Sequence, residues 1–398
     1  MIERHYLKCK TCEQPITLRI GLGRNKVQNH TFQCPNCSED IKLQLKIDYE
    51  NITTELIILE NCERGSEEGE IINLHPNFAI SEDKINKDFV SPFLDYVSDN
   101  RRDQLADFEI PSEKLQKEIQ RSLYLSDEWE DLKRAWSLML NGKIELAKTI
   151  TSNSADKFNY DDGLDSVNDW IFRFSHRILS PSKLSLFHDA AEYIRENVVL
   201  KYRSELKKFK EFYIENLYED HLERYFEVYS EFFSHYSEYS QLLNYMKENN
   251  RLPRDYRASS NDFKQTKMFF GNAYEHLTST LAILACYNNI ANGRPFDKFS
   301  TMDLKKYMTI NKANRANPFK ETKPFYRFAD CLDSTFRNAS HHGSVRFNKK
   351  KKKIIYRSGG TGAEKNMPYT EYLMKCNNLL FSVSALLMIE LLLHNTNF

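Results

Sequence analysis

The first 75 residues have the hydrophobic pattern of β-strands. Residues Ile41 to Ile47 alternate between apolar and polar with a period of two, and Glu55 to Glu60 form a short run rich in β-branched side chains. Both patterns are typical of strands. We therefore expect a small β domain over residues 1–75. Residues 76–107 are polar and irregular, and we expect them to form a linker.

Helical spacing replaces this pattern over residues 108–250, which we expect to form a helical middle domain. The passage from Ser126 to Ala147 predicts an isolated α-hairpin. Residues 189–248 predict a very long helical stretch rich in Tyr and Phe, with a break near residues 219–221. Its aromatic stripe is more typical of core packing than of a base-stacking surface. The apolar positions that share a face in the hairpin are Trp129, Leu132, Trp136 and Leu140.

A break around Pro253 precedes the last predicted domain, residues 255–398. Its helices are expected at about 263–291, 301–313, 324–342 and 368–394, with a basic hairpin-like segment at 344–357. The fold class we expect is mainly α. It combines a C-terminal helical bundle that carries a basic β-hairpin, a helical middle region and a small N-terminal β domain.

Composition narrows the class of protein. Apolar residues make up 41% of the 398 positions, which excludes wholesale disorder. The 12 Gly and 11 Pro are few for this length, which favours long helices over a turn-rich β architecture. Because 56 basic residues balance 56 acidic ones, any surface that binds nucleic acid must be local.

The chain shows no pattern that directs it to a membrane. The first residues lack the apolar stretch of a signal peptide. The most apolar run, Leu379 to Leu393, is interrupted by Glu390 and is shorter than the ~20 apolar residues that span a bilayer. We expect a buried C-terminal helix, no membrane partner and a cytoplasmic protein.

Two pairs of cysteines have the spacing of metal-binding knuckles. Cys9 and Cys12 form one pair, and Cys34 and Cys37 form the other. Two-residue spacing lets both thiolates of a pair reach one ion at ~2.3 Å, and two pairs complete a tetrahedron. A structural Zn²⁺ is the expected cofactor, with free core cysteines or an iron site as the alternatives. Four protein ligands leave no position for water, so we expect no catalytic metal.

What the predicted zinc ribbon binds stays open at this point: nucleic acid, a protein partner, or nothing beyond its own fold. The other four cysteines have no matching partner in the sequence, and buried packing is the interpretation we favour for them. They are Cys62, Cys286, Cys331 and Cys376.

A second chemically informative segment runs from Phe336 to Gly343. On a helix, Asn338 and His342 share one face, and Arg337 and His341 share a neighbouring one. An arginine fork suits two phosphate oxygens. An imidazole near the helix C-terminus can both donate and accept a proton. These are the groups that a metal-free phosphodiester cleavage needs, although an arginine and a histidine at this spacing also occur by chance.

This segment resembles the motif of the HEPN superfamily of helical ribonucleases, in which an Arg and an adjacent polar residue precede a His by four to six positions. The resemblance covers roughly residues 260–398 and maps the motif onto Arg337, Asn338 and His342. His341 is the other candidate for the catalytic imidazole. The resemblance implies a homodimer with one composite RNA-cleaving cleft, metal-independent cleavage that leaves a 2′,3′-cyclic phosphate, and a role as an antiphage effector or toxin. A phage trigger or an antitoxin is then a possible partner.

A basic segment follows the motif directly. Between Lys323 and Arg357 there are ten basic and two acidic residues, a local net charge of +8. Apolar residues on both sides of the lysine run suggest two strands with the lysines at the turn. The run could be a solvated edge or could attract an RNA backbone. The candidate RNA-binding residues are Arg346, Lys349, Lys350, Lys351, Lys352, Lys353 and Arg357.

Three smaller questions complete the sequence picture. Gly359 to Gly362 is expected to be a flexible connector rather than a nucleotide-binding loop. Glu275 and His276 could approach the motif across the bundle, although helix-surface positions are the commoner explanation. A non-catalytic nucleic-acid-binding or adaptor protein, which uses the ribbon and the basic hairpin, is the alternative to a ribonuclease.

Overall fold

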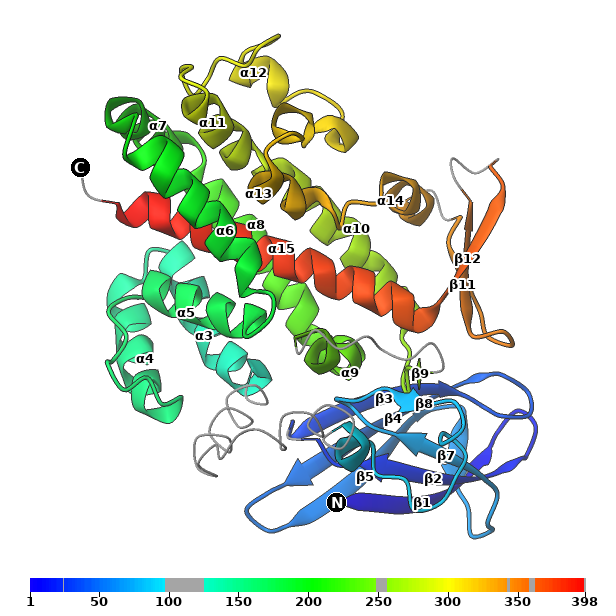
Figure 1. The fold of residues 1–398 in the computed structure, drawn as a ribbon. Coiled ribbons are helices and arrows are strands. Elements are labelled where there is room, and N and C mark those ends of the chain that lie inside the picture. Colours follow the sequence, from blue (N-terminus) through cyan, green and yellow to red (C-terminus); the bar gives the residue numbers. More distant parts are fainter. Residues whose placement is uncertain (24, 97–124, 248–255, 342–343, 358–361, 397–398) are drawn as a thin grey trace, which may run out of the picture. The chain divides into compact units, whose positions relative to one another are not determined.

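The computed structural model describes residues 1–23, 25–96, 125–247, 256–341, 344–357 and 362–396 (Figure 1). The chain divides into two compact units. Unit 1 comprises Met1–Ser126, His235–Met268 and Asn338–Asn377, and unit 2 comprises Asp127–Ser234, Phe269–Arg337 and Asn378–Phe398. The domain boundaries expected at 107–108 and at 250–255 lie outside the described residues.

Two sheets form the N-terminal part of unit 1. In the four-stranded sheet the order is β6-β1-β2-β7, and β2 and β7 are parallel. The three-stranded sheet is antiparallel, in the order β3-β4-β5. The strands are β1 (Ile2–Cys9), β2 (Pro15–Gly21), β3 (Val27–Gln33), β4 (Asp40–Asp48), β5 (Thr53–Glu60), β6 (Cys62–Arg64) and β7 (Glu70–Leu74).

The alternation predicted around residues 41–47 is confirmed on β4, where every second residue is buried. Each strand has one apolar face because successive side chains point to opposite sides of a sheet. The inner faces of both sheets contribute to a single hydrophobic cluster. Its central members are Leu7, Ile16, Leu18, Ile20, Phe32, Ile41, Leu43, Leu45, Ile47, Leu56 and Leu74.

Segments distant in the sequence complete unit 1. The strand β8 (Ile80–Ser81) pairs with β9 (Tyr256–Arg257), and α9 (Tyr236–Lys247) is almost entirely buried. Residues 76–81, which the sequence places in a linker, are buried as well. The predicted basic hairpin is confirmed as β10 (Arg346–Asn348) and β11 (Lys353–Arg357), with the lysines at its turn. A third strand that the sequence did not predict, β12 (Glu364–Pro368), pairs with β11.

A buried carboxylate joins several of these segments. Glu238 on α9 accepts hydrogen bonds from the Ser260 hydroxyl at 2.8 Å, the Asp262 backbone N–H at 2.9 Å and the Tyr369 hydroxyl at 3.3 Å. The Ser260 hydroxyl also accepts the backbone N–H of Thr31, on the edge strand β3, at 2.8 Å. The sheet that contains β3 is therefore fixed to α9 through one small polar loop, and this loop depends on Glu238.

Unit 2 is helical, and the predicted α-hairpin is confirmed as its first two helices. Three helices, α10, α14 and α15, are shared between the two units. The helices are α3 (Leu125–Leu140), α4 (Ile144–Lys157), α5 (Val167–Leu179), α6 (Leu184–Ile194), α7 (Arg203–Asn216), α8 (Tyr218–Ser234), α10 (Phe263–Thr280), α11 (Ala282–Ala291), α12 (Leu304–Tyr307), α13 (Lys323–Tyr326), α14 (Ser334–His341) and α15 (Tyr369–Asn395).

Four helices expected from the sequence are interrupted or shorter in the structure. The helix expected at about 263–291 is divided into α10 and α11, and the one expected at about 301–313 is only α12, followed by a 3-10 helix over Lys312–Asn314. Residues 189–247 form the end of α6, a π-helical turn over Arg195–Val199, and then α7, α8 and α9. In the helix expected at about 324–342, α13 ends at Tyr326 and a new helix, α14, begins at Ser334. The side chain of Asp333 accepts the backbone N–H of Phe336 at 2.9 Å. Such an N-terminal cap starts a new helix. Short interruptions escape a periodicity analysis because they change the helical phase only slightly.

The predicted C-terminal helix is confirmed as α15. It is long and apolar enough to cross a membrane, but 89% of its most apolar window is buried inside the protein, as in the core helix of a soluble protein. Its one buried acid, Glu390, accepts hydrogen bonds from the hydroxyls of Tyr213 at 2.8 Å and Tyr225 at 2.6 Å. The Nδ1 atom of His221 lies 2.9 Å from the same carboxylate. Three partners therefore offset the cost of burying this acid.

Glu238 should make the stability of unit 1 depend on pH. Burial raises the pKa of Glu238 from 4.5 to about 7, so the folded protein holds this proton more tightly than the unfolded chain does. Stability should therefore fall as pH rises between these two values. Relative to a Glu238→Gln variant, the parent protein should lose about 1 kcal/mol of unfolding free energy between pH 6 and pH 8. Urea unfolding of both proteins at the two pH values measures this. An equal pH response in both would contradict it.

Candidate metal centre and cationic site

The two cysteine pairs lie in turns with the same backbone structure. In the first, Cys9 N–H donates to the Gln14 carbonyl at 3.0 Å and Glu13 N–H donates to the Cys9 carbonyl at 2.9 Å. In the second, Cys34 N–H donates to the Glu39 carbonyl at 2.8 Å and Ser38 N–H donates to the Cys34 carbonyl at 3.0 Å. The residue after each second cysteine has a positive φ, 59° at Glu13 and 63° at Ser38. The two turns are thus equivalent knuckles.

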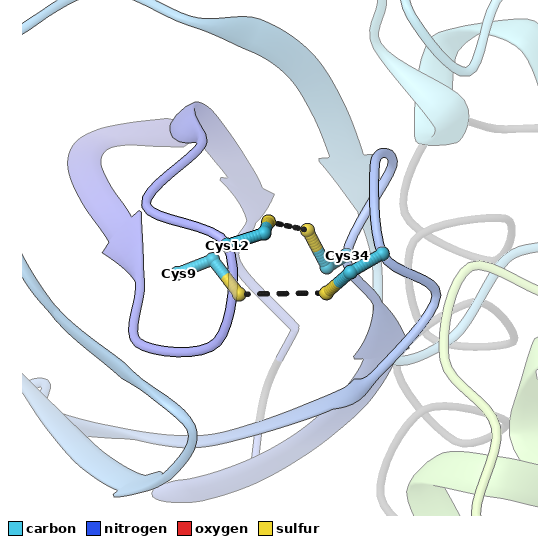
Figure 2. A group of neighbouring side chains, drawn as sticks. Cys9, Cys12 and Cys34 are labelled. Atoms are coloured by element: carbon cyan, nitrogen blue, oxygen red, sulfur yellow. Dashed lines mark hydrogen bonds between the residues drawn. The ribbon is translucent and has the colours of Figure 1, made fainter.

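The knuckles bring the four sulfur atoms together (Figure 2). All four Sγ atoms lie within 4.8 Å of one another, with Cys9 and Cys37 at 3.8 Å and Cys12 and Cys34 at 3.6 Å. A tetrahedron of sulfurs at ~2.3 Å from Zn²⁺ has edges of about 3.8 Å. The spacing and the all-sulfur donor set therefore fit a metal ion such as zinc.

Backbone hydrogen bonding and burial shift the pKa values of two of the thiols in opposite directions. A hydrogen bond from the Gln14 backbone lowers the pKa of Cys12 to about 6. Burial raises the pKa of Cys34 to about 12. A metal ion binds the thiolate form, so ion binding would supply the free energy that deprotonates Cys34.

A fifth cysteine, Cys62, is the direct cross-strand neighbour of Cys9 in the β1–β6 pair. Burial raises the pKa of Cys62 to about 11, which keeps it a neutral thiol. This neighbour could not be predicted from the sequence, because β6 is only three residues long and is too short to show a strand pattern. Within the described chain, the four clustered thiols are the one group of at least three His, Cys, Asp or Glu side chains with metal-binding spacing.

The second candidate site lies on α14. Arg337 occupies the first half of this helix and its side chain is partly exposed, and Asn338 beside it is exposed. On the same helix, Phe336 and Ala339 are buried. His341 is the last residue of the helix, whereas His342 and Gly343 lie outside the described residues. The geometry between the arginine and an imidazole therefore stays a prediction.

Within unit 2, Arg337 contacts a carboxylate from α10. Its Nε atom donates to Glu275 Oε1 at 2.6 Å, and its terminal nitrogen forms an ion pair with the same oxygen. Lys312 forms an ion pair with the other oxygen of Glu275 and lies 3.4 Å from its backbone carbonyl. Glu275 thus lies against the motif helix. The neighbouring His276 pairs instead with Glu227 at 3.2 Å.

The predicted RNA-binding cations divide into two groups in unit 1. Lys349 pairs with Asp40 at 2.9 Å, and Arg346 and Arg357 both pair with Glu364, at 3.4 and 3.2 Å. Four lysines at and next to the turn are exposed: Lys350, Lys351, Lys352 and Lys353. Arg346 and Arg357 are exposed too, but Glu364 partly balances their charge, so the net positive charge of the hairpin is concentrated near its tip.

No family model, curated protein or solved structure matches this chain. The two sites are consequently interpreted from their own geometry.

Lys312 is the residue near the motif that the sequence did not indicate. It is the first residue of a 3-10 helix, Lys312–Asn314, between α12 and α13, and its contact with Glu275 depends on tertiary packing. Glu275 could be singled out because it lies on a long helix, but its contact with Arg337 depends on tertiary packing. Cys34 and its partners, by contrast, are recognisable from spacing alone.

The metal centre makes a direct prediction. The purified protein should contain one Zn²⁺ per chain, and Cys34→Ser should lose the ion and unfold at a lower temperature, because zinc binding contributes to folding free energy. Elemental analysis and thermal denaturation measure both effects. Cys331→Ser, which alters a thiol outside the cluster, is the matched control and should retain zinc. A full complement of zinc in Cys34→Ser would contradict the assignment.

Proposed function

We propose that this protein is a metal-independent endoribonuclease of the HEPN type. Arg337, Asn338 and His342 would act on RNA, with His341 as the other candidate imidazole. The observation that carries the proposal is the position of Arg337: a partly exposed guanidinium on a short helix, next to exposed Asn338 and close to a second cation, Lys312. Guanidinium groups are well suited to phosphate recognition.

The proposed reaction is an internal transfer within RNA. The 2′-oxygen attacks the adjacent phosphorus, the bond to the 5′-oxygen breaks, and a 2′,3′-cyclic phosphate and a 5′-hydroxyl result. The proton leaves the 2′-hydroxyl and a proton reaches the departing 5′-oxygen. The imidazole would transfer a proton, and Arg337 would stabilise the negative charge that develops on the phosphate.

The remaining parts of the chain have supporting roles in this proposal. The four thiolates would hold a structural Zn²⁺, with no catalytic metal, because a tetrahedron of protein ligands leaves no open position. A homodimer would bring two motif helices to one cleft, which the resemblance to HEPN ribonucleases implies. We place the protein in the cytoplasm as an antiphage effector or toxin, controlled by a phage trigger or an antitoxin.

A non-catalytic RNA-binding or adaptor function is the second candidate, and the hairpin favours it. The exposed lysines near the tip of the β10–β11 hairpin would supply the positive charge that attracts an RNA backbone. Lys349 also connects this hairpin to Asp40, which follows the second cysteine knuckle. This function predicts tight, salt-dependent RNA binding with no cleavage between about pH 5.5 and pH 9, the range in which histidines titrate.

The central prediction concerns the motif itself. Purified protein should cleave structured RNA in the presence of EDTA and leave cyclic phosphate ends. Arg337→Ala and His342→Ala should each lower the cleavage rate by at least about 100-fold, the usual contribution of one acid–base or charge-stabilising group. Gel assays and end-group analysis of the products measure both outcomes.

Matched controls separate this effect from general damage. Arg327→Ala removes another arginine that is paired with a carboxylate in unit 2, and His394→Ala removes a histidine outside the motif. Both should cleave at the parent rate. The proposal fails if Arg337→Ala and His342→Ala cleave as fast as the parent, or if cleavage requires Mg²⁺.

A further inference from the structure

Two cations from separate segments of unit 2 converge on one carboxylate. Glu275 forms an ion pair with Arg337 through its Oε1 atom and an ion pair with Lys312 through its Oε2 atom. The three side chains are 24%, 28% and 32% exposed, in the order Glu275, Arg337 and Lys312. The cluster is therefore partly shielded from water and partly open to solvent.

Glu275 is ionised in this arrangement. Burial alone would raise the pKa of Glu275, but hydrogen bonds from Lys312 and Arg337 outweigh this effect and hold the pKa below its ordinary value. The carboxylate is therefore negative at neutral pH. It fills the space between the two cations with the charge and the paired oxygen atoms of an anion.

A phosphodiester presents the same features, since it carries one negative charge and two non-bridging oxygens. We propose that Lys312 and Arg337 form a binding site for a backbone phosphate, and that Glu275 occupies this site until the phosphate displaces it. That the phosphate belongs to RNA rests on the proposed function. Arg337 would supply a planar fork to two oxygens, and Lys312 would supply a compact charge to one of them.

This cluster differs from an ordinary ion pair on the surface of a single helix, as a comparison with Arg224 shows. Arg224 lies on α8 of the same unit and is paired with Asp220 of its own helix, through contacts of 2.6 and 2.9 Å. That pair is an intrahelical i,i+4 contact, which a helix makes without any ligand. Glu275, Lys312 and Arg337, in contrast, come from α10, the segment after α12, and α14. Their convergence is a product of the tertiary fold.

The test is equilibrium binding of the full-length protein to a 2′-O-methyl RNA oligonucleotide, followed by fluorescence anisotropy. The blocked 2′-oxygen prevents cleavage, so the measurement does not depend on activity. Glu275→Gln, which keeps the size of the side chain and removes its charge, should bind roughly tenfold more tightly. Lys312→Ala should bind roughly tenfold more weakly. It should also reduce the slope of log binding constant against log salt concentration by about one, because one fewer counterion is released on binding.

Lys305→Ala is the matched control, because it removes an exposed lysine of α12 in the same unit. It should change affinity much less than Lys312→Ala. If Lys312→Ala does not fold, as judged by thermal denaturation, Lys312→Gln provides a less disruptive substitution with the same expected direction. Competition by inorganic phosphate shows whether the site accepts a free anion as well as a strand.

Two results would overturn the inference. One is unchanged or weaker binding by Glu275→Gln, which would mean that the carboxylate positions Arg337 and does not compete with the ligand. The other is equal weakening by Lys305→Ala and Lys312→Ala, which would mean general electrostatic attraction. Failure of the proposed ribonuclease function is separate: binding would then shift as predicted while unmodified RNA stays intact.

Discussion

Each cysteine knuckle is the turn between two neighbouring strands, and the two turns belong to different sheets. The first knuckle joins β1 to β2, and the second joins β3 to β4. An ion held by all four thiolates would therefore tie the two sheets together. The second knuckle is also connected to the basic hairpin, because Glu39 and Asp40, which follow Cys37, both pair with Lys349. The metal centre, the sheets and the hairpin thus form one connected structure within unit 1.

The parts of the fold that the sequence predicted are those with strong local patterns. β4, the α3–α4 hairpin, the β10–β11 hairpin and α15 all have a clear period or length. The missed strands lack such a signal. β1 has several charged residues, and β7 joins its sheet only by pairing in parallel with the distant β2. Pairing of this kind depends on tertiary structure, which a single sequence does not report.

The two candidate sites differ in the same way. The cysteine cluster could be predicted from spacing, because each knuckle is a local structure that needs only its own few residues. The surroundings of Arg337 could not, because Glu275 and Lys312 are 62 and 25 positions away in sequence. The motif helix also begins at a cap on Asp333, which makes α14 a short, separate element and not the end of a long helix.

Glu390 has a consequence for the longest helix of the chain. An apolar helix that packs through shape alone can rotate about its axis or slide by a turn at little cost, since one leucine surface resembles another. A single acid that must meet two phenols and an imidazole allows only one azimuth and one axial position. Glu390, which interrupts the apolar run, therefore fixes the rotation and the axial position of α15 relative to α7 and α8.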